Sequence, residues 1–404
     1  MGEVTILQAV PRLDTGGSEQ AAVEIAEALG SAGARALVAT EGGRMATALT
    51  SAGGEIVPLP MASKNPFTIL ANAGRLARLI EERGVDLVHA RSRAPAWSAL
   101  LAARRTGRPF VTTYHGAYGT PGPFKTAYNS VMGRGDRVIA NSLYTADLIA
   151  SRHHVARERI RVIYRGVDLA KFAPEAVGQD RPARLRAAWG VRQGQPVVLQ
   201  AARLTSWKGQ GLVIEAARRL LDENRLGDAV FVQAGDAQGR EPYRHELERL
   251  IGASGLSGRV KLVGHCDDMP AAFAIAQVAV IASTSAETFG RTSIEAQAMG
   301  CPVIVSDIGA APETIIPALP GKQDYTGWVI PCHDPAAIAD RVAEALALSP
   351  QERAALGARA RRHAAANFTL SQMQRETLSV YDELLGTSLA ARFNERPSPA
   401  QWIS

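Results

Sequence analysis

The segment Ser283–Pro302, STSAETFGRTSIEAQAMGCP, determines how the second half of the chain folds. The apolar run before it, Val278–Ala282, predicts a buried strand, and a helix is expected to begin at about Gly290. Backbone N–H groups at a helix start favour anionic oxygens. Glu287 and Glu295 have seven residues between them and are expected to face one pocket. A helix-terminal charge and a solvated glutamate are the structural alternative, which the flanking glycines disfavour.

Outward from this segment, short β-rich runs alternate with segments of helical period in both halves of the chain. This alternation predicts parallel sheets with helices on both faces. The fold class is therefore α/β, with two doubly wound, Rossmann-like domains facing across a cleft. The predicted strands are Val4–Val10, Arg35–Thr40, Glu55–Pro58, Leu87–Ala90, Phe110–Tyr114, Arg137–Ala140, Val197–Ala201, Ala229–Ala234, Val260–Val263, Val278–Ala282 and Pro302–Ser306.

Glycines and prolines cluster in Lys171–Gln195, which predicts a linker or a domain boundary in this region. The predicted domains are residues 1–175 and residues 190–370. A helix over 371–386 and a flexible tail over 387–404 would follow.

The composition of the 404 residues is that of a globular protein, with 46% hydrophobic and 21% charged residues. Three cysteines form no CxxC or Cys/His cluster, so a reducing compartment is expected and no metal site is predicted. The N-terminus lacks the pattern of a signal peptide, and no apolar run reaches the roughly 20 residues of a membrane span. The net charge of +6 conceals +10 within residues 89–171, which suggests either an anionic partner or a solvated basic face.

A second motif, ARLTSWKGQG at residues 202–211, also follows a predicted strand. Arg203 can grip two phosphate oxygens, whereas Lys208 acts as a point charge. Together with Gly209 and Gly211 they would form a binding loop for a diphosphate. A leaving group that accumulates negative charge needs such a preorganised positive environment. A solvated pair of loop cations is the alternative.

The third motif is Gly16-Gly17, after the first predicted strand. Adjacent glycines let the backbone approach a ligand closely, although a tight turn with Ser18 as helix N-cap is the alternative. The dinucleotide fingerprint GxGxxG is absent, which weakens a dehydrogenase interpretation.

Taken together, these motifs resemble glycosyltransferase family 4, whose two-domain architecture is named GT-B. The resemblance covers about residues 4–385. It implies that residues 1–175 bind the acceptor, that residues 190–370 bind the nucleotide-sugar, and that the helix over 371–386 returns to the N-terminal domain. One departure is Arg165, where the family usually has Asn before Gly-Val-Asp. The matching elements are Gly16-Gly17, Tyr114-His115-Gly116, Asn141-Ser142, Arg165-Gly166-Val167-Asp168, Arg203 with Lys208, Glu287 with Glu295, and Gly309 with Glu313.

The resemblance implies a retaining, metal-independent hexosyltransferase that uses a nucleotide diphosphate-sugar and no cofactor. It implies no enzyme nucleophile and no general base, because the leaving phosphate takes the proton of the acceptor. Arg203 and Lys208 would hold the diphosphate, and Glu295 the ribose. Glu287 would bind hydroxyls of the donor sugar. The other implied contacts come from Phe289, Gly290 and Arg291, from Gly16 and Gly17 over the phosphates, and from His115 beside the sugar or the cleft backbone.

The loop Gly264–Asp268 resembles the segment of the family that binds the base. A carboxylate there can accept two N–H donors from guanine but only one from uracil, so Asp268 or Asp267 fits a GDP-sugar, with a UDP-sugar as the other donor. The default role of this pair is to cap the helix that follows. On the acceptor side, Arg91 and Arg93 follow a strand end and would line the cleft.

The segment Pro121–Arg137 mixes aromatic and basic residues, which suits docking at an anionic membrane surface; a surface helix packed on its own sheet is the alternative. His89–Trp97 and Thr113–Tyr118 resemble lipopolysaccharide-core mannosyltransferases of Gram-negative bacteria. The resemblance therefore implies GDP-mannose as donor and an anionic lipid-linked glycan as acceptor. It also implies a cytoplasmic protein held peripherally on the inner membrane, with no nucleic-acid partner.

Three other functions are weighed against this hypothesis. A nucleotide-sugar epimerase would need no acceptor, and the basic acceptor surface argues against it. A phosphorylase is disfavoured because no lysine stands out as a pyridoxal anchor. A nucleotide-sugar-binding protein without catalysis is disfavoured by the intact Arg203, Lys208, Glu287 and Glu295.

Overall fold

The chain was analysed as a computed structural model, which describes residues 3–14, 16–117 and 122–393. It divides into two compact units. The described residues up to Arg165 and those from Leu370 onward form the first unit, and Gly166–Thr369 forms the second. Tyr118 and Pro121 of the predicted acceptor-side segments lie outside the described residues, as do residues 394–404 of the predicted tail.

The first unit is built on a parallel sheet of seven strands in the order β3-β2-β1-β4-β5-β6-β7. The inner strands β1, β2 and β5 are buried along almost their whole length, and their sequences are mostly apolar, as expected for parallel strands covered on both faces. The short strand β7 was not predicted. The strands are β1 Thr5–Ala9, β2 Arg35–Thr40, β3 Gly54–Pro58, β4 Leu87–Ala90, β5 Phe110–Tyr114, β6 Arg137–Ala140 and β7 Ile160–Val162.

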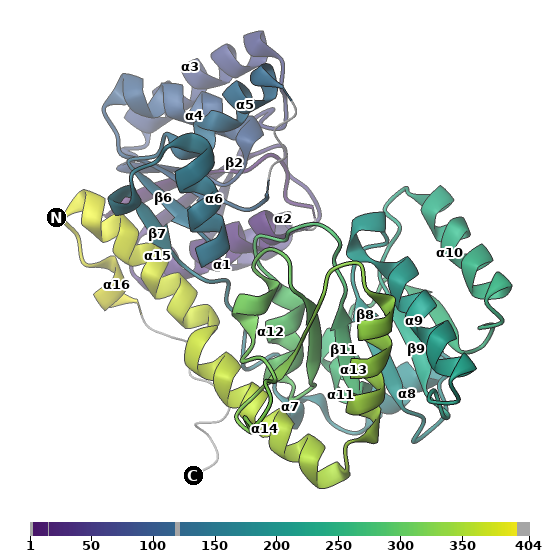
Figure 1. The fold of residues 1–404 in the computed structure, drawn as a ribbon. Helices are drawn as coiled ribbons and strands as arrows, with labels where there is room; N and C mark the ends of the chain where they lie inside the picture. Colours follow the sequence, from purple (N-terminus) through teal and green to yellow (C-terminus); the bar gives the residue numbers. More distant parts are fainter. Residues whose placement is uncertain (1–2, 15, 118–121, 394–404) are drawn as a thin grey trace. The chain divides into compact units, whose positions relative to one another are not determined.

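Helices cover both faces of this sheet (Figure 1). Their alanine and leucine side chains join the apolar core against it. Asn65 caps α3 through its side chain, and Ser142 caps α6 in the same way. The helices are α1 Gly17–Ser31, α2 Ala46–Ser51, α3 Pro66–Glu82, α4 Arg93–Thr106, α5 Pro123–Asn129, α6 Leu143–His153, α15 Leu370–Leu385 and α16 Leu389–Arg392, with 3-10 turns at Ser130–Gly133 and Arg157–Arg159.

The second unit repeats the design with six parallel strands in the order β10-β9-β8-β11-β12-β13. The apolar core of this unit includes Val198 of β8 and Val278 and Val280 of β11. Strand β13 was not predicted. The strands are β8 Val197–Ala201, β9 Val230–Ala234, β10 Val260–Gly264, β11 Val278–Ile281, β12 Val303–Ser306 and β13 Gly327–Ile330.

Helices also flank the second sheet, and the longest of them, α14, begins with a complete capping box at Ser349 and Glu352. The helices are α7 Pro174–Val177, α8 Asp180–Ala188, α9 Gln210–Asp222, α10 Glu241–Ala253, α11 Met269–Ile275, α12 Arg291–Ala298, α13 Pro335–Ala347 and α14 Pro350–Asn367, with 3-10 turns at Ser206–Lys208 and Ala311–Thr314. Two parallel, doubly wound sheets of this kind define the GT-B fold class, as predicted.

The predicted linker or boundary segment Lys171–Gln195 is not an extended linker, and the boundary between the two units lies shortly before it, between Arg165 and Gly166. It contains α7 and α8, and both helices pack on α11 of the second unit. Arg181 of α8 forms a two-bond ion pair with Asp268, at 2.8 and 2.6 Å. The glycines and prolines of the segment therefore begin and end short helices instead of forming an extended connection.

The C-terminal helix α15 belongs to the first unit, where it packs along α1; Figure 1 colours it yellow beside the purple and blue N-terminal elements. The buried side chains of Leu378 and Tyr381 join the core of that unit. Within the predicted flexible tail, α16 buries Leu389 completely and Phe393 almost so. The first part of that tail is therefore ordered, because these apolar side chains join the core of the first unit.

Among the helices in the described part of the chain, none is both long enough and apolar enough to cross a lipid bilayer.

Candidate active site

The site in the second unit is centred on an ion pair between Lys208 and Glu287. Lys208 ends the 3-10 turn after β8, and Glu287 lies in the loop after the neighbouring strand β11. Because parallel strands end at the same edge of a sheet, the two loops meet there. The Nζ of Lys208 lies 2.7 Å from Oε2 of Glu287, and the side chains are 17% and 13% exposed. The structure thus brings together two of the predicted catalytic residues.

Glu287 is held from two further directions. The hydroxyl of Ser283 donates to its second carboxylate oxygen, Oε1. Its backbone carbonyl accepts the N–H of Ala310 at 2.9 Å. A Cβ at Gly309 would lie 2.5 Å from that carbonyl oxygen, and the φ of Gly309 is +67°, so only glycine fits at this position. Glu287 therefore has a fixed backbone and a carboxylate shared between a cation and a hydroxyl.

Helix α12 begins beside this pair. Gly290 is its N-cap, and the half-buried side chains of Arg291 and Glu295 form an ion pair of 3.5 Å. Lys208, Glu287 and Gly290 line a hollow of about 10 Å³ together with Ser283 and residues at the ends of β8 and β11. That volume holds about one water molecule. A helix start, a carboxylate and an ammonium are therefore concentrated at one point.

Phe289 contributes differently from its predicted role. Its side chain is only 7% exposed and packs edge-on against Phe368, with ring centroids 5.9 Å apart. The ring anchors the loop between Glu287 and α12 in the core of the unit. A direct contact of this side chain with a donor is not supported by that burial.

Arg203 occupies the same loop as Lys208 but is exposed. The ammonium of Lys208 also lies 4.5 Å from the ring centroid of Trp207, a cation–π distance. The loop therefore presents one exposed cation at Arg203 and one cation held between Glu287 and Trp207.

Asp268, the predicted contact to the base, is already engaged. Its side chain accepts the backbone N–H of Ala271 and caps α11, the default role, and it binds the guanidinium of Arg181. The hydrogen bond from Arg181 is the main reason that the pKa of Asp268 is lowered. The neighbouring Asp267 is 94% exposed and bonds only His265 in the described structure, at 2.9 Å. Of the two carboxylates, Asp267 is the accessible one.

In the first unit, Gly16 and Gly17 lie exposed at the start of α1. The guanidinium of Arg165, the residue that departs from the family pattern, donates to the carbonyl oxygen of Gly17 at 2.6 Å. Arg165 is 5% exposed and lies 4.0 Å from the carboxylate of Glu24. A buried cation therefore fixes the start of α1.

Arg91 is a correction to the predicted acceptor surface. It directly follows β4, as expected, but its side chain is buried among the core elements and is 2% exposed. Its Nε donates to the amide oxygen of Gln8 at 2.5 Å. Arg93, in contrast, is half-buried at the first turn of α4 and donates to Asn129 at 2.8 Å. Only Arg93 of the two reaches the surface.

His115 directly follows β5, at the edge of the first sheet where Arg91 follows β4. Burial lowers the pKa of His115 well below its usual value, and the nearby charges of Arg165 and Arg91 lower it further. A neutral imidazole at this position orients or hydrogen-bonds a ligand without adding charge. The sequence did not single out His89, whose ring nitrogens bond Tyr381 at 2.6 Å and Thr113 at 2.7 Å in the interior.

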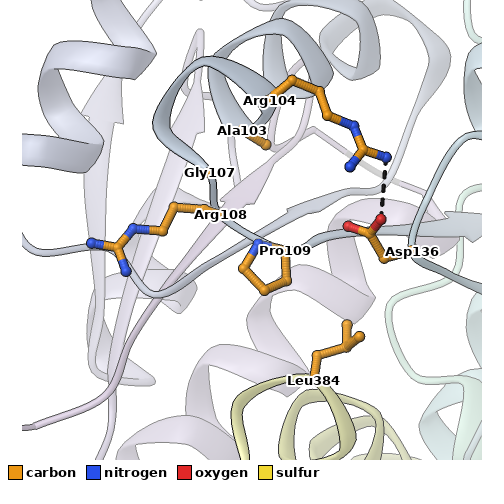
Figure 2. A pocket seen from close by; sticks show the side chains of 7 residues that line it. All are labelled: Ala103, Arg104, Gly107, Arg108, Pro109, Asp136 and Leu384. Carbon is orange, nitrogen blue, oxygen red and sulfur yellow. Dashed lines mark hydrogen bonds and ion pairs between the residues drawn. The ribbon is translucent and has the colours of Figure 1, made fainter.

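A larger hollow of about 310 Å³ lies at the opposite end of the first sheet (Figure 2). Its wall includes Pro109 and Asp136, which directly precede β5 and β6, and Leu384 of α15. Figure 2 shows Arg104 turned toward Asp136, with which it pairs at 3.1 Å, and Arg108 turned the other way. The site loops follow the strands, so this hollow is separate from them.

Sequence reasoning missed Ser283 and Trp207 as partners of the ion pair, and Arg181 as the partner of Asp268. Ser283 begins the quoted segment and Trp207 directly precedes Lys208, so proximity in sequence was the available signal. Arg181 lies 87 residues from Asp268, and no local pattern joins them.

Two parallel α/β sheets, with an acidic loop and a basic loop that meet at one strand edge of the second sheet, fit the GT-B class of glycosyltransferases. Two family models match the chain: Glycosyltransferase Family 4 over residues 15–171 and Glycosyl transferases group 1 over residues 183–363. The chain belongs to glycosyltransferase family 4, a family of retaining hexosyltransferases.

Individual relatives agree with this assignment. A D-inositol 3-phosphate glycosyltransferase of Catenulispora acidiphila is 30% identical over 312 residues, which are 73% of this chain and 72% of that protein. The crystal structure of a glycosyltransferase from Rickettsia africae matches with a TM-score of 0.87 and 32% identity, covering 96% of this chain and all of that one. HepE of Anabaena, in complex with UDP-glucose, shares the fold with a TM-score of 0.81 at 23% identity, over 95% and 100% of the two chains.

Proposed function

We propose that the chain transfers a hexose from a nucleotide diphosphate-sugar, with the loop of Arg203 and Lys208 on the diphosphate and Glu287 on the donor sugar. The observation that carries this proposal is the ion pair of 2.7 Å between Lys208 and Glu287, set beside the start of α12. Glu295, half-buried one turn into that helix, is the proposed partner of the ribose hydroxyls. A carboxylate only accepts hydrogen bonds, which suits hydroxyl donors.

The ion pair indicates how the donor would be received. A bound diphosphate carries more total negative charge than the carboxylate does and offers Lys208 several acceptor oxygens for charge-assisted hydrogen bonds. Lys208 would turn to the phosphate, and Glu287 would then be free to accept hydrogen bonds from sugar hydroxyls. As the bond to the anomeric carbon breaks, negative charge grows on the diphosphate, and Arg203 and Lys208 stabilise it. No residue is assigned as general base, and no metal is required in this scheme.

GDP-mannose is the proposed donor. The exposed carboxylate of Asp267 carries this choice, because guanine offers it two N–H donors. Asp268 no longer supports it, since Arg181 and the start of α11 occupy its oxygens. The choice is tested by a panel of GDP- and UDP-sugars with mass detection of the product, in which turnover of UDP-sugars alone would refute it.

The proposed acceptor is an anionic, membrane-anchored glycan such as the lipopolysaccharide core, and the proposed location is the cytoplasmic face of the inner membrane. The support is the basic excess in residues 89–171 and an apolar–basic tip on α5. At that tip Phe124 is 91% exposed, and Lys125 is exposed beside it. Val131 and Met132, the apolar residues that follow α5 in the same predicted segment, are fully buried and do not contribute to this surface.

Vesicle binding tests the membrane contact. The purified protein should sediment with vesicles that contain anionic lipid and should remain in solution with neutral vesicles. The double change Phe124→Ser and Lys125→Glu should abolish sedimentation without changing transfer to a soluble acceptor. Equal sedimentation of the double variant would refute a contact through α5.

A second acceptor class is favoured by a specific observation. The relative of 30% identity from Catenulispora acidiphila is named for D-inositol 3-phosphate, and a phosphorylated cyclitol would also suit a basic acceptor unit. Parallel reactions with an inositol phosphate and with a deacylated anionic glycan separate the two classes. Isomerised donor without any acceptor would instead indicate an epimerase, and binding without turnover a non-catalytic protein.

A further inference from the structure

Three buried glutamines lie directly beneath the loop that carries Arg203 and Lys208. Gln200 is on β8, Gln233 is its register partner on the adjacent strand β9, and Gln210 begins α9. Their side chains are 3%, 1% and 0% exposed. A buried amide costs free energy unless it is hydrogen-bonded, so three of them in an otherwise apolar core require a reason.

Their hydrogen bonds converge on the two ends of the basic loop. The amide nitrogen of Gln210 donates to the backbone carbonyl of Arg203 at 2.9 Å. That of Gln200 donates to the carbonyl of Lys208 at 2.8 Å. The amide of Gln233 donates to the side-chain oxygen of Gln200 at 3.2 Å and to the backbone carbonyl of Gln210 at 3.0 Å, and so joins the other two.

The loop that carries Arg203 and Lys208 is also held by the neighbouring strand end at Ala282 and by the side chain of Tyr243. Gly209 has a φ of +75°, and a Cβ there would lie 1.9 Å from the carbonyl oxygen of Ala282 on the neighbouring strand end. The hydroxyl of Tyr243 donates to the side-chain oxygen of Gln210 at 3.3 Å, and burial raises the pKa of Tyr243 to about 12, which keeps that proton in place. The loop thus has little freedom to move away from the sheet.

We infer that Gln200, Gln210 and Gln233, called here the glutamine clasp, are positioning residues that preset the two cations for a diphosphate. The inference rests on the proposed roles of Arg203 and Lys208. The carbonyls that the clasp holds belong to Arg203 and Lys208 themselves, so the clasp fixes the backbone from which each cationic side chain extends before a ligand arrives. Preset cations bind a diphosphate without the cost of ordering the loop.

An alternative is that the glutamines merely satisfy buried carbonyls and stabilise the fold. Gln195 provides a matched control for that possibility. It is 9% exposed, and its amide donates to the carbonyl of Asp228 at 3.0 Å, just before β8 begins and thus at the opposite end of the sheet from the loop. Loss of this bond should lower the melting temperature without touching the cations.

The experiment measures calorimetric dissociation constants of GDP and UDP, and of the corresponding monophosphates, for Gln200→Met, Gln210→Met and Gln195→Met. Both clasp variants should bind the preferred diphosphate about tenfold more weakly, which corresponds to about 1.4 kcal/mol. The Gln195 variant should keep the wild-type diphosphate affinity even if its melting temperature falls as far. With donor as substrate, the clasp variants should raise KM and lower kcat together.

If the clasp variants and the Gln195 variant lose stability alike and all retain wild-type diphosphate affinity, the inference is overturned. Should a clasp variant fail to fold, Tyr243→Phe replaces it, because this change removes one hydrogen bond at the half-buried edge of the clasp. It should weaken diphosphate binding about two- to threefold, and unchanged binding would count against the clasp. Lys208→Met distinguishes failure of the clasp inference from failure of the proposed function. If this variant binds the diphosphate as tightly as the wild type does, the proposed function itself fails.

Discussion

The pair of Lys208 and Glu287 makes an unusual prediction for the variant Glu287→Ala. Removal of the Glu287 carboxylate leaves the mostly buried ammonium of Lys208 without the partner that lies 2.7 Å from it. Breaking a buried pair costs about 3–5 kcal/mol and an exposed pair about 0.2–1 kcal/mol; side chains that are slightly exposed should fall between, at about 2 kcal/mol. For a folding unit of roughly 200 residues, this loss lowers the melting temperature by about 4–8 °C.

A bound nucleotide should reverse this loss. In the wild type, a diphosphate must compete with Glu287 for Lys208, whereas in Glu287→Ala the ammonium has no competing partner. The thermal shift produced by GDP or UDP should therefore be larger in the variant than in the wild type. Transfer should nevertheless fall by about 10²-fold or more, because the donor sugar loses the carboxylate that orients it.

Differential scanning fluorimetry with and without nucleotide gives both shifts, and product mass gives the transfer rate. Glu287→Gln is the matched control, since it keeps the shape but not the charge and should show the same enlarged shift. Wild-type transfer by Glu287→Ala would refute the assigned role of Glu287. A smaller nucleotide shift than in the wild type would refute the competition for Lys208.

Three further predictions concern charge and burial. Arg181 holds the folded-state pKa of Asp268 below its unfolded value. The stability that this pair contributes is therefore present above about pH 4 and is lost as the pH falls through the folded-state pKa. Urea midpoints should show a smaller loss of stability at low pH in Asp268→Asn than in the wild type. Burial lowers the pKa of His89 in the folded state, so the unfolded chain takes up a proton first and stability should fall as the pH drops below about 6.5. In urea titrations from pH 8 to pH 5, His89→Gln should lose less stability than the wild type. An equal loss of stability in the two proteins would contradict this prediction. Arg91→Glu should prevent folding, as judged by circular dichroism, whereas Arg93→Glu should fold and raise KM for an anionic acceptor; an unaffected acceptor KM would remove Arg93 from the acceptor site.

Much of the fold was predictable because its signals are local. Buried strands of a parallel sheet are short apolar runs, and Arg35–Thr40 and Val197–Ala201 were placed at their observed bounds. The edge strands β7 and β13 escaped because three or four residues with polar neighbours carry little pattern. The segment Lys171–Gln195 was misjudged because prolines and glycines also begin and end short helices that tertiary contacts stabilise.

The site divides in the same way. Glu287 and Lys208 were identified from loops that follow strands, and strand order alone brings those loops together. Arg91 also follows a strand, but sequence cannot show which face of the sheet receives its side chain, and Gln8 receives it in the core. The glutamine clasp was invisible for a related reason: single polar residues within strands show no partner until β8, β9 and α9 are packed together.

The central claim is that Lys208 and Glu287 serve transfer from a nucleotide diphosphate-sugar. The most direct measurement is a donor panel with a phosphorylated cyclitol and an anionic glycan as acceptors, scored by product mass and by the anomeric configuration of the new linkage. The account predicts a glycosylated product with the configuration of the donor, lost in both Lys208→Met and Glu287→Ala. Donor conversion that needs no acceptor, or wild-type product formation by either variant, would contradict it.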